Sequence, residues 1–222
     1  MKLSKNTINI LKNFSVINNG ILFEPGSLIR TKTVQNTILA EATIEEVIPL
    51  EFGIYDLSEF LNVLSLFQNP DIEFSPKFMK IIDGKNSVKY YAGDKSILVT
   101  PKKNIVFPEP EISFELSSDL LQQIKKTSSI LNAPDVSFVG DAGELKLVVS
   151  DKKNPTSNAF EYNIGNTELN FVIDFKVDML KFINMDYNIF ISSKKISKFE
   201  SLDQQLVYYV GVEATSIFPE WW

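Results

Sequence analysis

Lysine is the side chain with which this chain is best equipped to do chemistry, and the chemistry is the attraction of phosphate groups. The 222 residues include neither histidine nor cysteine. Ser-His-Asp triads, thiolate nucleophiles and zinc sites built from Cys and His are therefore excluded. Arg30 is the single arginine among 22 basic residues. Because arginine is the usual reader of guanine, we do not expect base-specific recognition of DNA.

The most informative lysines lie on two predicted helices. The helical period places Lys5 and Lys12 on the polar face of the first helix, residues 4–19, and Lys125 and Lys126 on that of another, residues 117–131. We expect both faces to carry Asn, Gln and Ser between the lysines, and no acid. Ordinary solvation of surface lysines is the alternative. With two expected neighbours, the predicted phosphate-facing set is Lys2, Lys5, Lys12, Lys125, Lys126 and Lys181.

The carboxylates give little support for acid–base catalysis. Glu45 and Glu46 are adjacent in a predicted strand and so point to opposite faces. We interpret them, like Glu109 and Glu111, as solvated surface charges. The nine glycines are scattered singly at turns, so the sequence has no glycine-rich phosphate loop. We expect no catalytic residue, no cofactor and no metal site.

The composition is that of a globular chain with room for two domains. Its length fits one large domain or two of about 110 residues each. A formal net charge of −6 argues against binding nucleic acid over the whole surface, but it permits a local basic face. No apolar run is long enough for a membrane span or a signal peptide. We therefore expect a soluble intracellular protein.

The order helix, strands, helix, strands occurs twice. The predicted helices cover 4–19, about 56–67, 117–131 and about 176–184. Shifts of 113 to 119 residues superpose similar residues in order: Ser4 on Ser117, Leu11 on Ile124, Phe52 on Phe171, Leu61 on Leu180, and Tyr90 on Tyr208. We interpret the chain as two copies of one α+β module, each with two helices packed on antiparallel sheets.

A connector separates the two copies. Three prolines fall between residues 101 and 110 and disfavour regular structure. The predicted division is a first module at 1–100, an extended connector at 101–111, and a second module with a C-terminal tail at 112–222.

Two apolar segments lie outside any periodic pattern. One is Val106, Phe107 and Pro108 in the connector, and the other is the end of the tail, Ile217 to Trp222. Terminal residues are usually polar. These segments either pack onto the body of the protein or offer an apolar anchor to a partner.

The chain resembles a known family, the sliding clamps of T-even-type bacteriophages. These clamps are similar in fold to proliferating cell nuclear antigen. The resemblance is dense in the first 70 residues and extends into the second half. It is carried by Met1-Lys2-Leu3-Ser4-Lys5, Leu11-Lys12-Asn13-Phe14, Ile54-Tyr55-Asp56-Leu57 and Lys198-Phe199-Glu200.

The resemblance implies a protein without catalytic activity. Three chains would join head to tail into a closed homotrimeric ring of six DNA-clamp modules, with helices around the hole. Such a ring encircles double-stranded DNA, tethers the replicative DNA polymerase, is opened by an ATP-driven clamp loader, and also serves late viral transcription. It would act in the cytoplasm of the infected bacterial host. The alternative is a non-enzymatic structural or interaction protein of the virus particle, and a carboxylate enzyme ranks last.

The resemblance also implies roles for particular residues. Lys5 and Lys12 match lysines of the helices that line the hole, and the remaining predicted lysines follow only through the internal repeat. The segment 106–108 borders the partner-binding pocket, and Ile217 and Phe218 form its other wall. The strands near 88–91 and 160–164 are candidate subunit edges. The ending Pro219-Glu220-Trp221-Trp222 departs from the family pattern and would cover the pocket if it folded back.

Overall fold

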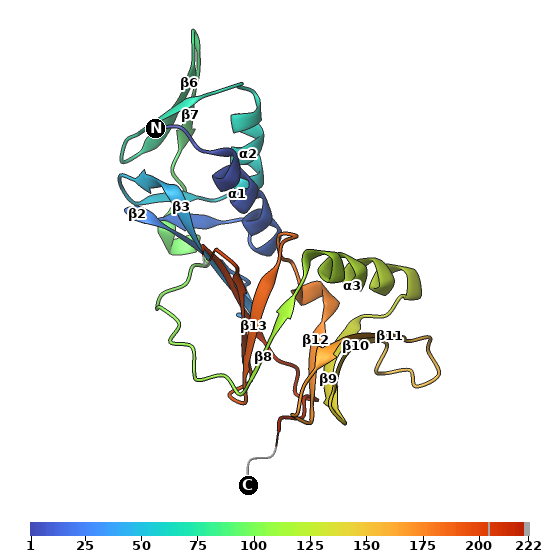
Figure 1. Ribbon diagram of the computed structural model, residues 1–222. Coiled ribbons are helices and arrows are strands. Elements are labelled where there is room, and N and C mark those ends of the chain that lie inside the picture. The colour runs from blue at the N-terminus through green and yellow to red at the C-terminus, as the bar shows by residue number, and fades with distance from the viewer. Residues whose placement is uncertain (204, 220–222) are drawn as a thin grey trace. The chain divides into compact units, whose positions relative to one another are not determined.

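The computed structural model describes residues 1–203 and 205–219. It shows helices and antiparallel strands in two compact units (Figure 1). The first unit comprises Met1–Ile105 and Gln205–Tyr208, and the second comprises the other described residues from Val106 onward. The change of unit lies within the segment 101–111, which contains no helix or strand. None of the described helices is long and apolar enough to span a membrane.

The first three predicted helices and the strands between them follow the predicted order, but the fourth predicted helix does not form. The first unit contains α1 (Lys5–Ile17), β1 (Ile21–Phe23), β2 (Gly26–Lys32), β3 (Ile38–Ile48), β4 (Phe52–Ile54), α2 (Leu57–Ser65), β5 (Asp71–Phe74), β6 (Phe78–Asp83), β7 (Asn86–Tyr91) and the short 3₁₀ turn η1 (Lys95–Ile97). Then come β8 (Ile112–Leu116), α3 (Ser118–Leu131), β9 (Asp135–Asp141), β10 (Glu144–Ser150), β11 (Phe160–Asn166), β12 (Phe171–Lys176), the 3₁₀ turn η2 (Val177–Met179), β13 (Tyr187–Ser192), β14 (Ile196–Ser201) and β15 (Leu206–Gly211).

The predicted duplication is confirmed element by element. The series α1-β1-β2-β3-β4-α2-β5-β6-β7 is matched by α3-β9-β10-β11-β12-η2-β13-β14-β15. Strand pairing repeats as well, because β1–β4 and β2–β3 correspond to β9–β12 and β10–β11, and β5–β6–β7 corresponds to β13–β14–β15. Ser4 and Ser117, which the sequence alignment superposes, both cap a helix by accepting a backbone hydrogen bond three residues on.

Strand β8 also has a counterpart at the N-terminus. β8 pairs with β13, the equivalent of β5. In the first unit, Met1 and Ile72 of β5 exchange hydrogen bonds: the terminal amine donates to Ile72 O at 2.8 Å, and Ile72 N donates to Met1 O at 2.7 Å. The repeated unit therefore begins just before its first helix.

The prediction of a fourth helix over 176–184 is wrong, since only the 3₁₀ turn η2 forms there. After this turn Leu180 and Phe182 are buried, two residues apart, which is a strand-like and not a helical spacing. The Phe182 ring lies 4.6 Å from that of Phe199 between centroids. Burial of these two side chains by the sheet therefore decides the local conformation.

The helices bury one face and expose the other. α1 and α2 lie side by side, and α1 also packs on β2 and β3, while α3 packs on β10 (Figure 1). The buried apolar side chains of the helices are Ile10, Leu11, Phe14, Ile17, Leu57, Phe60, Leu64, Leu120, Leu121 and Ile124. Each buried side chain of this size contributes about 1.5–3 kcal/mol. Their burial fixes which residues each helix presents to solvent.

Candidate DNA and partner interfaces

The polar face of α1 presents the two lysines predicted to attract phosphate. Lys5 and Lys12 are exposed and lie two helical turns apart. They border a groove between α1 and α2 whose floor includes Leu61 and Leu64. Neither lysine forms an ion pair with any described residue. Both ammonium groups are therefore available to an external anion.

The N-terminus of α1 is held by a carboxylate from β3. Glu46 accepts hydrogen bonds from the Ser4 backbone nitrogen and from the Thr7 hydroxyl, the latter at 2.6 Å. Burial opposes the charged form of this carboxyl, but the bonds from Thr7 and Ser4 outweigh it and hold the pKa of Glu46 below its usual value. Glu46, interpreted from sequence as a solvated charge, thus positions the helix that carries Lys5.

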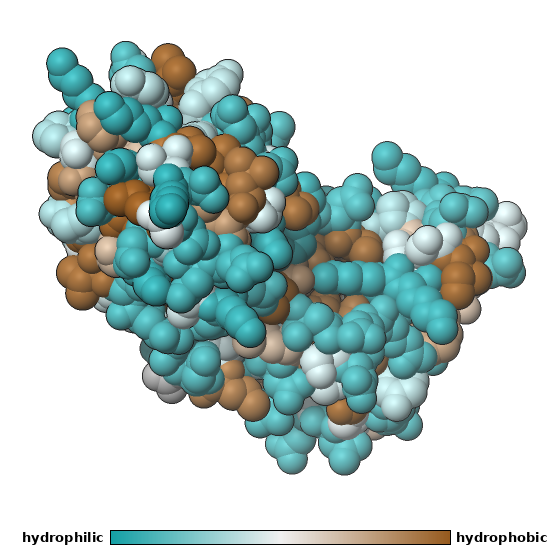
Figure 2. Space-filling view, turned by 90° about the horizontal axis from the view of Figure 1, so that it is seen from above, coloured by the Kyte–Doolittle hydropathy of each residue, from teal (hydrophilic) through white to brown (hydrophobic). Residues whose placement is uncertain are grey.

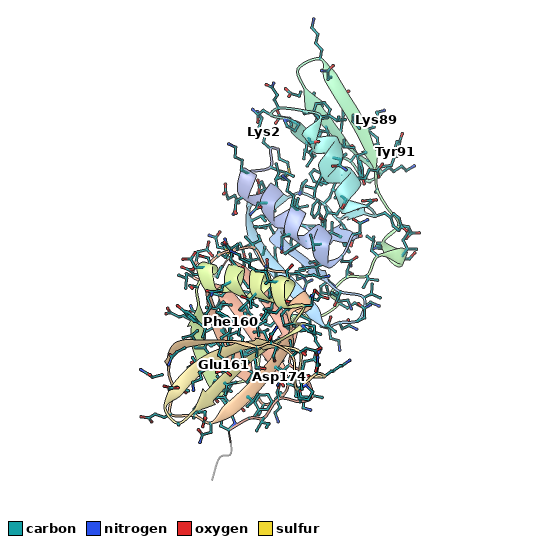
Figure 3. The ribbon with its side chains drawn as sticks, turned by 90° about the vertical axis from the view of Figure 1, so that its right-hand side faces the viewer. Lys2, Lys89, Tyr91, Phe160, Glu161 and Asp174 are labelled. Carbon is teal, nitrogen blue, oxygen red and sulfur yellow. The ribbon has the colours of Figure 1, made fainter. Side chains whose placement is uncertain are left out.

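Lys2, unlike Lys5 and Lys12, lies within ion-pair distance of a carboxylate among the described residues. Its Nζ lies 3.9 Å from a carboxylate oxygen of Asp71, and both side chains are about half exposed. Exposed ion pairs of this kind contribute little, about 0–1 kcal/mol. Figure 3 shows Lys2 at the N-terminal end of α1. Lys2 is therefore a neighbour of the α1 lysines, and Asp71 partly offsets the charge of Lys2.

The two lysines of α3 differ from each other. Lys126 is exposed, whereas Lys125 is half-buried and donates from Nζ to Phe182 O at 3.1 Å. Burial lowers the pKa of the Lys125 ammonium. Asp119 lines the same surface groove as both lysines. The expectation that this face carries no acid is therefore wrong for α3, because Asp119 lies two helical turns before Lys126 and so on the same face.

Lys181 was predicted to lie on the fourth helix. Because that helix is absent, Lys181 occupies the segment between η2 and β13 and is half-buried. The neighbouring Phe182 carbonyl is the group that binds Lys125. The structure therefore brings Lys125 and the chain at Lys181 together, though not through a helix.

The start of the connector is held by the single arginine. The Arg30 guanidinium forms an ion pair with Glu24 at 2.7 Å and donates to Asn104 Oδ1 at 2.9 Å. Arg30 thus anchors the segment that leads to Val106. Sequence analysis identified Arg30 only as an argument against base readout, and its structural role depends on a contact across 74 residues.

The three apolar connector residues differ in exposure: Phe107 packs on Tyr209, Val106 is almost fully exposed, and Pro108 is half-buried. The Phe107 ring lies 6.2 Å from that of Tyr209, and Lys198 Nζ lies 5.8 Å from the Phe107 centroid. Val106 is 91% exposed. Pro108 is half-buried. An aromatic ring fixed beside an exposed valine is a surface of the kind that anchors a partner.

The tail residue Ile217 contacts a different strand from those that Phe107 contacts. Ile217 forms an isolated antiparallel bridge with Val172 of β12, whereas Phe107 contacts β14 and β15. The Ile217 side chain is 63% exposed, and Phe218 is half-buried. Trp221 and Trp222 lie outside the described residues, so the predicted cover of the pocket stays a prediction.

The surface carries both hydrophilic and hydrophobic side chains. The face seen in Figure 2 is mainly hydrophilic, and its hydrophobic side chains form separate groups. Among the described residues no group of three or more Asp and Glu side chains is arranged to hold a metal ion.

Solved structures with the same fold define the class of protein. The PCNA of Thermococcus kodakaraensis matches with a TM-score of 0.69 and 12% identity over 94% of this chain and 96% of that chain. The PCNA of Entamoeba histolytica matches with a TM-score of 0.68 and 13% identity over 93% and 94%. The Helicobacter pylori beta clamp, solved with a DNA ligase peptide, matches with a TM-score of 0.64 and 16% identity. That match covers 100% of this chain and 68% of the beta clamp. The fold is that of the DNA clamps.

Sequence relatives then identify the family. The sliding clamps of Vibrio phage KVP40, Escherichia phage RB69 and Enterobacteria phage T4 are 35%, 34% and 33% identical to this chain. The alignments cover 96–97% of this chain and 98–100% of the relatives. The DNA polymerase processivity factor family matches residues 2–107. The chain belongs to the sliding-clamp family of phage processivity factors, which are not enzymes, and the resemblance found in the sequence is confirmed.

Proposed function

We propose that three copies of this chain join head to tail into a closed ring that encircles duplex DNA and tethers a replicative DNA polymerase. The ring acts in the cytoplasm of a phage-infected bacterium, where an ATP-driven clamp loader opens it and late transcription factors also use it. Family membership and the duplicated clamp fold support this function.

The observation that carries the proposal is a strand pairing within the chain. β3 lies next to β15, and Thr43 N donates to Gln205 O at 2.8 Å. In the repeat, β11 corresponds to β3 and β7 corresponds to β15. Among the described strands, β7 and β11 each lie at the edge of a sheet. The same pairing between β11 of one copy and β7 of the next would cover both of these edges. It would make a heterologous, head-to-tail interface, the type from which closed rings are built.

The two edges also complement each other in charge. Lys80 and Lys89 lie directly opposite each other on β6 and β7, an arrangement of like charges that costs stability. Glu73 of β5 lies opposite Lys80 on its other side, so Lys89 on the edge strand is the lysine that an outside carboxylate would serve. β11 exposes Glu161 (Figure 3). A partner strand that carries a carboxylate therefore suits β7, and the second copy supplies one.

Aromatic side chains mark the same two edges. Tyr91 on β7 is 68% exposed, and Tyr162 on β11 is stacked on Phe160 with centroids 6.4 Å apart and an interplanar angle of 10°. Large aromatic residues are enriched at protein interfaces. Their exposure on two otherwise polar strands favours burial in an assembly.

Lys5 and Lys12 of α1 and Lys126 of α3, all exposed, then attract the DNA backbone. Attraction of this kind is not specific for sequence and weakens with salt, so retention on DNA has to come from the closed ring. The whole chain has a formal net charge of −6, and this excess of carboxylates discourages DNA binding on the outside. A ring that slides freely raises the concentration of the tethered polymerase at the primer end.

Topology provides the decisive experiment. The purified protein should sediment as a trimer. When loaded by its ATP-driven loader, it should stay on nicked circular DNA and be lost when a restriction enzyme linearises the circle. A monomer in sedimentation, or equal retention on circular and linear DNA, would overturn the proposal.

A further inference from the structure

The C-terminal segment docks along β12 by backbone pairing. Ile217 N donates to Val172 O at 2.7 Å, and Val172 N donates to Ile217 O at 2.9 Å. Glu213 N also donates to Asp174 O at 3.0 Å. The segment 213–217 therefore covers the edge that β12 would otherwise leave open in the four-stranded sheet.

Asp174 is the side chain around which this docking is organised. Its carboxylate is buried, with 2% of the residue exposed. Oδ1 accepts a hydrogen bond from the Ser137 hydroxyl at 2.7 Å and pairs with the Lys152 ammonium. Oδ2 accepts from the Thr215 hydroxyl at 2.6 Å, and the Asp174 backbone nitrogen donates to Ser216 Oγ at 2.9 Å. Together with the Glu213 backbone nitrogen, the tail thus supplies three of the groups that satisfy this residue.

A buried carboxylate stays charged only where neighbouring groups donate hydrogen bonds to it or form an ion pair with it. Burial opposes ionisation of Asp174, but hydrogen bonds from Lys152, Thr215 and Ser137 outweigh it, so the pKa of this carboxyl lies below its usual value. Release of the tail would leave Oδ2 without the Thr215 hydroxyl in a buried site, which is unfavourable. Docking of the tail is therefore favoured by the charge of Asp174.

We propose that Asp174 is a positioning residue for the partner surface, because it locks the C-terminal segment on β12 and so holds Ile217 and Phe218 in place for a partner peptide. This inference rests on the proposed function. The Ile217 backbone is fixed by two hydrogen bonds while its side chain remains largely exposed. An apolar side chain held on a fixed backbone binds with a smaller entropy cost than one on a free tail.

The chain offers a matched control in Asp135. This residue lies on β9, is 3% exposed, pairs with the Lys176 ammonium and accepts a hydrogen bond from Lys152 N at 3.0 Å. Its chemistry resembles that of Asp174, but the contacts of its carboxylate are with Lys152 and Lys176 and not with the tail. A substitution at Asp135 disturbs a buried ion pair without removing a tail contact.

The expected partner is a short apolar C-terminal peptide, which would insert an aromatic anchor between connector and tail. The experiment compares Thr215→Val, Thr215→Ser, Asp174→Asn and Asp135→Asn in the full-length protein. It measures hydrogen exchange at the Ile217 amide and the Kd for a fluorescent synthetic peptide copied from the C-terminus of the replicative polymerase. Thr215→Val should speed exchange about tenfold and weaken peptide binding about three- to tenfold, and Thr215→Ser should restore both. Asp174→Asn should act like Thr215→Val, and Asp135→Asn should lower the melting temperature with peptide binding unchanged.

Two results would overturn the inference. One is unchanged exchange and affinity in Thr215→Val, and the other is an equal loss of affinity in Asp135→Asn and Asp174→Asn, which would indicate general destabilisation. If the wild-type protein did not bind the peptide, the proposed partner surface would fail instead. Faster exchange in Thr215→Val would then still support Asp174 as the anchor of the tail.

Discussion

The Lys125 ammonium donates a hydrogen bond to the backbone carbonyl oxygen of Phe182 at 3.1 Å. This bond holds the half-buried Lys125 against the body of the second unit, while its neighbour Lys126 remains exposed. Two adjacent lysines that look equivalent in the sequence therefore have different roles: Lys125 stabilises the fold, and Lys126 is free to attract phosphate.

The first prediction separates these two lysines. Lys126→Ala should shorten retention on circular DNA at moderate salt and leave the melting temperature within about 1 °C of wild type, since exposed substitutions change stability little. Lys125→Ala should lower unfolding stability by about 1 kcal/mol, because the Phe182 carbonyl loses its donor. Thermal unfolding and a DNA-retention assay read out the two effects. Equal behaviour of both variants would contradict the assignment.

A second prediction concerns the polar face of α1. Lys5→Glu combined with Lys12→Glu should weaken loading and sliding, because the positive charge offered to phosphate is reversed, and should leave trimer formation intact. Binding of the protein to short duplex DNA, without a clamp loader, should also depend less on salt. The steepness of log K against log salt should fall by about 0.9 for each phosphate group that is no longer neutralised. Lys153→Glu, in an exposed loop of the second unit, is the control. Unchanged retention in the α1 variant would exclude α1 from the DNA-facing surface.

The third prediction is a pH dependence that originates at Glu46. Glu46→Gln should destabilise the protein by about 1 kcal/mol at neutral pH, since the charged acceptor of the Thr7 and Ser4 hydrogen bonds is lost. The pKa of Glu46 is lower in the folded protein than its ordinary 4.5. Its stabilisation is therefore fully present above pH 4.5 and is lost as the pH falls through the folded-state pKa. Denaturant unfolding between neutral and acidic pH should show the two proteins converging at low pH, while Glu45→Gln should follow wild type throughout.

The fourth prediction tests the subunit edges by charge reversal. Lys89→Glu and Glu161→Lys should each weaken trimer formation severalfold, and the double variant should recover most of the loss, because it restores opposite charges across the interface. Exposed ion pairs contribute about 0.2–1 kcal/mol, so the effect should fade in high salt. Sedimentation over a range of concentrations measures it. Additive losses in the double variant would show that these residues do not face each other.

The fifth prediction addresses the connector. Phe107→Ala should weaken binding of the polymerase peptide about tenfold or more, as expected for an aromatic anchor, and leave the trimer intact. Val106→Ala, which removes only an exposed aliphatic group, should cost less. Fluorescence anisotropy with the labelled peptide provides the affinities. An affinity in Phe107→Ala equal to that of wild type would assign the ring to packing on Tyr209 alone.

The amino-acid sequence by itself determined the duplicated module and the lysine face of α1, because both depend on local chemistry. Ser4 and Ser117 cap their helices through bonds to residues three positions away, and the apolar period of α1 decides which side Lys5 occupies. Such interactions can be read from spacing alone.

Only the tertiary structure decided the features that depend on distant partners. Burial of Phe182 beside Phe199 replaced a predicted helix by a short turn, and the bond to the Phe182 carbonyl distinguished Lys125 from Lys126. Asp174 and Thr215 meet across 41 residues, and no local pattern marks either one. Interactions of this kind follow from strand register and packing, which the sequence specifies only through the folded chain as a whole.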